Sequence, residues 1–125
     1  MIELKNILLV IAGSAAGGSA RYITSLVVQS KNNTQFPMGT FMINLIGCFI
    51  IGMVYALAAR NASNGSDIKL LLATGFCGGF TTFSAFAFEN LELFKSGLHL
   101  TALVYIILSV VLGILAVVLG TYLIK

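Results

Sequence analysis

The stretch GFCGGFTTFS, residues 75–84, lies inside a long apolar segment and decides how that segment can fold. Two adjacent glycines and two adjacent threonines are poor residues for a continuous helix. Gly79 is the eleventh residue after Ile68, which places it about 16 Å along a helix that rises about 1.5 Å per residue. In a hydrocarbon core of about 30 Å, this stretch predicts a helix that is broken near the midplane.

A break at that depth has chemical consequences, because it frees backbone carbonyls and amides from their helical partners. In hydrocarbon these groups must find other partners or line a protected site. A bound cation is one solution for freed carbonyls, and broken helices with ion sites recur in transport proteins. The alternative is that the glycine pair serves only close helix packing, and the stretch by itself leaves both interpretations open.

The composition indicates a membrane domain. The chain has 125 residues, of which 58% are hydrophobic and 9% are charged, whereas soluble domains carry about 25% charged residues. We therefore expect one all-α domain, residues 1–125, embedded in lipid. The net charge of +3 is scattered, and the absence of a basic cluster argues against nucleic-acid binding.

Four apolar stretches are long enough to cross a bilayer, which takes about 20 residues each. Polar loops are expected at residues 29–35 and 60–67, and short loops make neighbouring helices antiparallel. The sequence therefore predicts four transmembrane helices, the third of them broken. The expected spans are residues 4–28, 38–59, 68–94 and 98–124.

The distribution of Lys and Arg predicts the orientation of these spans. Four spans place both termini on the same side as the second loop. That side holds Lys5, Arg60, Lys69 and Lys125, and the other holds Arg21, Lys31 and Lys95. Lys/Arg bias normally sets topology, so four against three predicts insertion in both orientations and hence an antiparallel homodimer. Small residues four apart, such as Gly13 and Gly17, allow close helix approach but assign no interface.

Three polar side chains inside or near the spans are candidates for function. Asn44 carries an amide that is costly to bury in lipid without a partner, so it faces either a neighbouring helix or a pore. Arg21 either extends to the lipid headgroups or lines a vestibule that attracts anions. Glu89, late in the third span, either pairs with a cation, caps a vestibule or simply lies at the membrane interface, and interfacial placement is the favoured interpretation.

Two further groups of residues fall on helix faces. Phe83 and Phe86 are three residues apart and share a face; such rings ordinarily contact lipid or pack in the core, although their positive edges can face an anion. In the fourth span Tyr105, Ser109 and Gly113 recur every four residues. With Ser84 they would form a polar stripe for an ion, or they serve helix packing.

The sequence offers no catalytic set, and we expect no enzyme. It contains one histidine, and neither converging carboxylates nor a phosphate-binding loop can be found. Cys48 and Cys77 lie in apolar runs without the spacing of a metal site, which indicates small buried thiols.

Taken together, these segments resemble the Fluc/CrcB family of bacterial fluoride channels. The resemblance covers nearly the whole chain and is carried by GGSARY at 17–22, by PMGT at 37–40 with Asn44 and Gly47, and by residues 75–89. It implies a passive, fluoride-selective channel that exports fluoride across the bacterial inner membrane. It also implies an antiparallel homodimer with two pores.

The same resemblance implies roles for individual residues. Backbone carbonyls of Gly78 and Thr81, from both subunits, would hold a central structural sodium ion. The fluoride pathway would use the edges of the Phe83 and Phe86 rings, the Asn44 amide, the Arg21 vestibule charge and a polar track of Ser84, Tyr105 and Ser109. The chain departs from the family at Ala85, where many members have Thr, and at Gly113, where some have Ser, so the track is thinner here.

Two other classes of membrane protein fit the sequence less well. A small four-helix drug or cation exporter needs an acidic residue within its first helix, whereas Glu3 precedes the first span and no acidic residue follows inside it. A structural subunit that transports nothing would not need the broken third helix, the buried Asn44 and the phenylalanine pair together.

Overall fold

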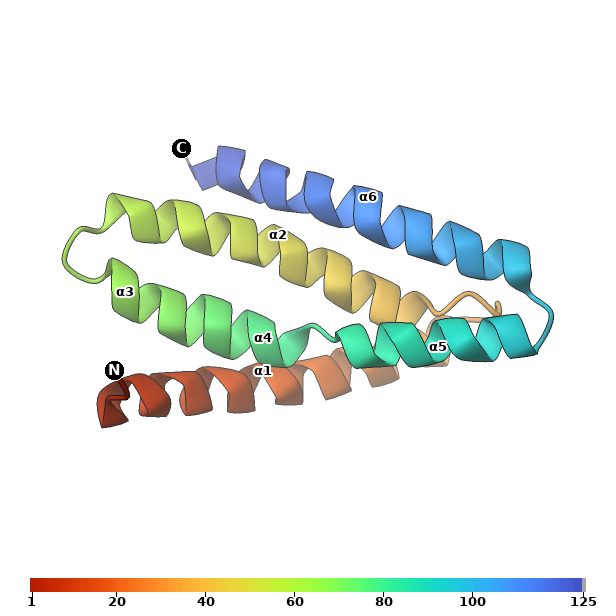
Figure 1. The fold of residues 1–125 in the computed structure, drawn as a ribbon, viewed down its shortest axis with the longest axis horizontal. Coiled ribbons are helices and arrows are strands. Elements are labelled where there is room, and N and C mark those ends of the chain that lie inside the picture. The colour runs from red at the N-terminus through yellow and green to blue at the C-terminus, as the bar shows by residue number, and fades with distance from the viewer. Residues whose placement is uncertain (125) are drawn as a thin grey trace.

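The computed structural model describes residues 1–124 and is all-helical. The elements in chain order are α1 (Leu4–Lys31), α2 (Met38–Arg60), α3 (Gly65–Ile68), the π-helical segment η1 (Lys69–Cys77), α4 (Gly78–Phe80), α5 (Phe83–Lys95) and α6 (His99–Ile124). The elements α3, η1, α4 and α5 follow one another along one line and form the third long helix (Figure 1). Four stretches are long and apolar enough to span a membrane: Leu4–Lys31, Met38–Arg60, Gly65–Lys95 and His99–Ile124.

The predicted fold class is therefore confirmed: the protein is a multi-pass membrane protein with a broken third helix. Figure 1 shows the two termini at the same end of the bundle, as an even number of spans requires. The third helix lies between α1 and α2, and α2 lies between the third helix and α6.

The loops are shorter than the sequence indicated. Helix α1 continues through residues 29–31, where Lys31 lies favourably at the C-terminal end of the helix dipole. The turn that follows is closed by Asn32, whose Nδ2 donates to the Phe36 carbonyl at 2.8 Å and whose Oδ1 accepts from the Thr34 hydroxyl at 2.8 Å. The second loop likewise shrinks, because α3 already begins at Gly65.

Helix α1 lies in backbone contact with the third helix through glycines on both elements. A Cβ atom on Gly13 would collide with the Leu71 carbonyl, and one on Gly17 would collide with the Phe76 carbonyl. On the other side of the contact, a Cβ on Gly79 would lie 2.7 Å from the Ser14 carbonyl oxygen. The spacing of glycines on α1 therefore serves packing within one chain.

Helices α2 and α6 form a second close pair by the same means. A Cβ atom on Gly52 would collide with the Val117 carbonyl, and one on Gly120 would collide with the Phe49 carbonyl. Close backbone approach of this kind drives helix association in lipid, where the hydrophobic effect between helices is absent.

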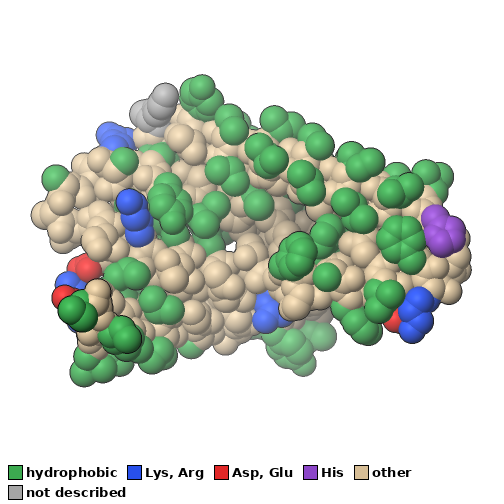
Figure 2. Space-filling view, viewed as in Figure 1, with side chains coloured by type: hydrophobic (Ala, Val, Ile, Leu, Met, Phe, Trp, Pro, Cys, Tyr) green, Lys and Arg blue, Asp and Glu red, His purple; other side chains and the backbone are tan. Residues whose placement is uncertain are grey.

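Most of the outer surface is apolar. Figure 2 shows hydrophobic side chains along the whole length of the molecule, whereas most of the charged side chains visible on this face lie near its two ends. The same face is hollowed near its middle. This hollow lies where the third helix is broken, between the two close helix pairs.

We expect Gly17→Ala to lower the free energy of unfolding by about 1–3 kcal/mol, because the added methyl group overpacks a backbone contact. Gly18→Ala is the matched control, since no atom beyond its chain neighbours and the backbone of its own helix lies within 4 Å of its Cβ position. It should be neutral or slightly stabilising, because alanine is the better helix former. Unfolding in mixed detergent micelles measures both variants, and equal losses for the two would contradict the packing described.

Candidate functional site

The break in the third helix falls at two threonines. Helix α4 ends at Phe80, Thr81 and Thr82 are extended with φ/ψ of −89°/159° and −150°/119°, and α5 begins at Phe83. The glycine pair, where the sequence placed the weak point, is helical: Gly78 has φ −61° and ψ −38°. The reason is that Gly79 is needed for the close approach of α1, whereas β-branched threonines suit extended backbone.

Each threonine ends one half of the helix. The Thr81 hydroxyl and N–H both donate to the Cys77 carbonyl, at 2.8 and 2.9 Å, which closes the first half. The Thr82 hydroxyl oxygen accepts from the N–H of Ala85 at 3.1 Å and thus caps the N-terminus of α5.

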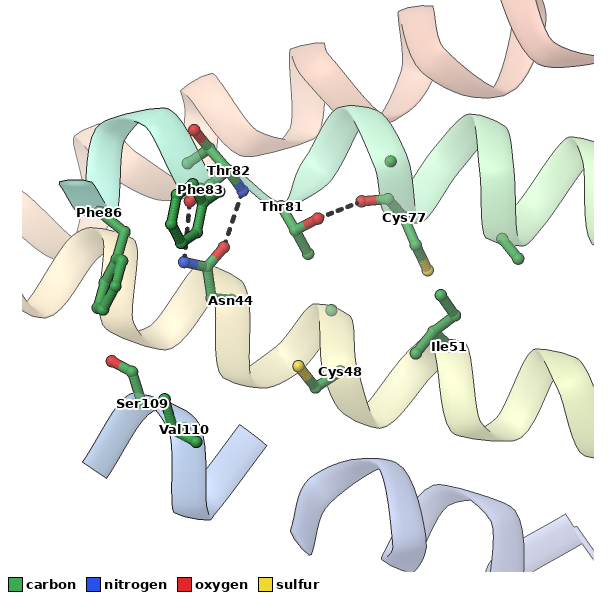
Figure 3. A pocket seen from close by; sticks show the side chains of 13 residues that line it. Asn44, Cys48, Ile51, Cys77, Thr81, Thr82, Phe83, Phe86, Ser109 and Val110 are labelled. Atoms are coloured by element: carbon green, nitrogen blue, oxygen red, sulfur yellow. Dashed lines mark hydrogen bonds between the residues drawn. The ribbon is translucent and has the colours of Figure 1, made fainter. Parts of the chain in front are cut away.

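Asn44, from the middle of α2, holds the break from one side. Its Oδ1 accepts from the N–H of Thr82 at 2.8 Å, and its Nδ2 donates to the carbonyl of Thr82 at 3.1 Å (Figure 3). Of the two partners that the sequence left open for this amide, the structure shows the neighbouring helix. A contact between Asn44 and an ion stays a prediction.

Arg21, from α1, holds the break from another direction. Its Nε donates to the carbonyl of Gly79 at 3.0 Å. In an unbroken helix this carbonyl would accept from the N–H of Phe83, four residues on. Arg21 is half-buried. Its place at the headgroups or in a vestibule stays a prediction.

The break diverts the helical donors of two particular carbonyls. In a continuous helix the N–H of Thr82 would bond to the Gly78 carbonyl, but it bonds to Asn44. The N–H of Ala85 would bond to the Thr81 carbonyl, but it bonds to the Thr82 hydroxyl. Gly78 and Thr81 are the two residues whose carbonyls the family resemblance implied as sodium ligands.

An open groove of about 380 Å³ lies beside the break. Residues from α2, η1, α4, α5 and α6 line it, and α1 contributes none (Figure 3). The lining residues are Asn44, Gly47, Cys48, Ile51, Ala73, Cys77, Gly78, Thr81, Thr82, Phe83, Phe86, Ser109 and Val110.

Most of the predicted site residues meet at this groove. Asn44, Gly78, Thr81, Phe83, Phe86 and Ser109 all line it. The Phe83 and Phe86 ring centroids are 5.8 Å apart, and Phe83 is 78% exposed. The Ser109 Oγ is buried and has no hydrogen-bond partner within residues 1–124. Ser84 is exposed and contacts the Thr82 hydroxyl at 3.2 Å.

Tyr105 and Gly113, the remaining positions of the expected polar stripe, are both buried but contact different neighbours. Tyr105 is fully buried and contacts Phe86, with ring centroids 4.9 Å apart. Gly113 is buried, and its Cβ position lies 3.4 Å from the Cys48 sulfur, close to an ordinary van der Waals contact. Its place in the polar stripe stays a prediction.

A cluster of polar groups beyond Phe86 was missed by the sequence interpretation. The Tyr105 hydroxyl donates to Glu89 Oε1 and the Thr40 hydroxyl to Oε2, each at 2.7 Å. Glu89, for which simple interfacial placement was favoured, is thus held between α2 and α6. A carboxylate inside a membrane span is a signal of function in its own right, whereas nothing in the sequence singled out Thr40 as its partner.

Comparison with known proteins places this multi-pass, broken-helix protein in a family. Residues 8–121 match the family described as "CrcB-like protein, Camphor Resistance (CrcB)", and the chain belongs to it. This confirms the resemblance and agrees with the prediction that the chain is no enzyme.

Several curated relatives carry the name "Fluoride-specific ion channel FluC". That of Phocaeicola vulgatus is 47% identical over 119 residues, covering 95% of this chain and 98% of its own length. That of Prosthecochloris aestuarii is 46% identical over 91% of this chain and 88% of its own, and that of Azobacteroides pseudotrichonymphae is 40% identical over 94% of both chains. The similarity therefore spans all four helices.

Replacement of Asn44 by alanine should lower the free energy of unfolding by about 2–5 kcal/mol, because both polar groups of Thr82 lose their partner in a protected place. Asn61→Ala is the matched control. Its Nδ2 makes a single bond, to the Leu57 carbonyl at the end of α2, so its loss should stay near 1 kcal/mol. If Asn44→Ala lowers the free energy of unfolding no more than Asn61→Ala does, Asn44 does not stabilise the break as described.

Proposed function

We propose that this protein is a passive, fluoride-selective channel that exports fluoride from the cytoplasm of a bacterium. Full-length relatives with this printed function support the proposal. The observation that carries it is the single groove, beside the broken helix, in which Asn44, Phe83, Phe86 and Ser109 come together. No catalytic set is needed for such an activity.

The groove offers what a small anion needs when it leaves water. Selectivity for fluoride over chloride requires a narrow path with donors that replace its tightly held hydration shell. Donors come from the Ser109 hydroxyl, which has no partner within residues 1–124, and from the second N–H of the Asn44 amide. The phenylalanine pair supplies ring edges, whose hydrogens carry the positive part of the quadrupole.

The polar track continues from Ser109 to Tyr105 across Phe86. The Tyr105 hydroxyl hydrogen points at Glu89, so an anion can use that donor only when this bond opens. The Thr40 hydroxyl donates to the other oxygen of Glu89. We propose that it, too, can donate to an anion only when this bond opens. Ser84, at the exposed start of α5, and the charge of Arg21 complete the proposed pathway.

A second copy of the chain, inserted the opposite way up, completes the proposed assembly. The groove is open, and 78% of Phe83 is exposed along it. Polar groups that line an open groove in the middle of a membrane must be covered by protein and not by lipid, so we expect a second protein surface on the open side of the groove. Nearly balanced Lys/Arg counts favour an antiparallel homodimer, and its symmetry would give two pathways.

A sodium ion between the two copies is the proposed cofactor. The carbonyls of Gly78 and Thr81 have lost their helical donors, and both residues line the groove. Unwound carbonyls and the C-terminal ends of half-helices suit a small hard cation. Two carbonyls from each copy would give the ion four oxygen ligands, and its charge would neutralise the negative ends of two half-helices.

Passive movement through a channel is enough to remove fluoride from the cytoplasm. Hydrogen fluoride is a weak acid that crosses membranes in its neutral form and dissociates in a near-neutral cytoplasm, where the anion is trapped. The inside-negative membrane potential drives an anion outward, and 100 mV contributes about 2.3 kcal/mol per charge. A selective pore in the inner membrane is therefore enough.

Purified protein in liposomes should release fluoride, measured with a fluoride electrode, and should release no chloride at a comparable rate. Replacement of either Phe83 or Phe86 by isoleucine should cut fluoride efflux by roughly tenfold or more, because the loss of a ring-edge contact worth ~1.5 kcal/mol slows passage by about that factor.

Phe94→Ile is the control for the loss of a ring. Phe94 is also on α5, but it lies outside the groove and contacts His99. Its efflux should equal that of the unmodified protein. Chloride release as fast as fluoride release would refute the channel's selectivity, and an unchanged rate in both groove variants would refute the role of the phenylalanine pair.

A further inference from the structure

Arg21 acts on the broken helix from outside the groove. Helix α1 contributes no residue to the groove lining, and Gly79, the partner of Arg21, is not among the lining residues either. By contrast, Gly78 and Thr81 line the groove. The residues near the break thus divide into two sets: Gly78 and Thr81 line the groove, whereas the Gly79 carbonyl contacts Arg21.

The position of Arg21 follows from the packing of α1. Gly17 lies against the backbone of Phe76 and Phe80, and Gly79 lies against Ser14 and Gly18. Arg21 is one helical turn beyond Gly17, so its side chain comes alongside the end of α4. There its Nε–H meets the Gly79 carbonyl at 3.0 Å.

This bond fixes one of two peptide planes that flank the break. A carbonyl and the N–H of the next residue lie in one rigid plane and point in opposite directions. Arg21 therefore fixes the plane between Gly79 and Phe80, and Asn44 fixes the plane between Thr81 and Thr82. The chain between the two planes, which carries the Phe80 carbonyl, has little freedom left. The Thr81 carbonyl lies in the plane that Asn44 fixes, and the Gly78 carbonyl lies in the plane directly before the one that Arg21 fixes.

We infer that Arg21 is a positioning residue of the ion site: its Nε–H holds the Gly79 carbonyl on the α1 side and so keeps the Gly78 and Thr81 carbonyls directed at the groove. This inference rests on the proposed sodium site. It differs from a role as a vestibule charge, because it assigns the effect to one hydrogen-bond donor at one atom. The guanidinium charge, at the negative end of a half-helix, adds only a secondary contribution.

Three substitutions separate the donor from the charge. In Arg21→Gln the amide nitrogen takes the place of Nε along the side chain, so the donor stays and the charge is lost. In Arg21→Met a methyl group takes that place, so both are lost. In Arg21→Lys the charge stays, but a methylene replaces the donor and the ammonium lies one atom further on.

The experiment measures thermal unfolding of each purified protein against sodium concentration, with a large organic cation keeping the ionic strength constant. A site-bound ion raises the midpoint as its concentration rises. We expect Arg21→Met and Arg21→Lys to need roughly tenfold more sodium for half of the effect, as the loss of a charge-assisted hydrogen bond implies. Arg21→Gln should stay within about threefold of the unmodified protein, because a neutral donor is somewhat weaker.

Lys31→Gln is the control for charge. Lys31 is exposed in the last turn of α1, and loss of its charge should leave the sodium response unchanged. Fluoride efflux from liposomes is measured on the same proteins as a separate test of the channel, because the charge of Arg21 is itself part of the proposed pathway.

A sodium response that Arg21→Lys keeps and Arg21→Gln loses would overturn the inference, since charge would then be the active property. If Arg21→Lys does not fold, the comparison rests on the two uncharged variants, Arg21→Gln and Arg21→Met. The inference is then overturned if both need the same sodium concentration for half of the rise in unfolding midpoint. A protein without any sodium response refutes the sodium site and this inference together, whereas the efflux assay judges the fluoride channel separately.

Discussion

A helix that opens inside a membrane must satisfy its own backbone, and in this protein one side chain pairs with both backbone groups of a residue at the opening. The Asn44 amide pairs with both the N–H and the carbonyl of Thr82. Because the N–H of Thr82 is taken, the Gly78 carbonyl loses its helical donor, and because the Thr82 hydroxyl caps α5, the Thr81 carbonyl loses its donor as well. The proposed ion ligand at Gly78 thus depends on the Asn44 pairing, and the one at Thr81 depends on the cap beside it.

Glycines build the frame that makes such an opening tolerable. They let α1 lie against the third helix and α2 against α6, backbone to backbone. Two close helix pairs leave space between them, and the break faces that space. The same packing brings Arg21 to the Gly79 carbonyl, so that α1, which never touches the groove, still influences it.

The sequence predicted the class of fold and most of the site, because apolar length and the helix-poor stretch at 75–84 are local properties. It placed the break at the glycines, since propensity alone does not show that Gly79 is used for contact with Ser14. It did not find the pairing of Glu89 with Thr40 and Tyr105, whose bonds join three helices. Partners of this kind depend on how helices are rotated against one another, and four nearly uniform apolar spans carry little information about rotation.

The conformation of Thr81 and Thr82 in lipid tests the central claim most directly. These two residues are the only adjacent threonines in the sequence, so a threonine-labelled sample gives a single sequential Thr–Thr correlation by solid-state NMR. The account predicts Cα and Cβ shifts of extended backbone for both residues, while Thr74, inside η1, shows helical shifts. Helical shifts at both Thr81 and Thr82 would mean that the third helix is continuous, and would contradict the account.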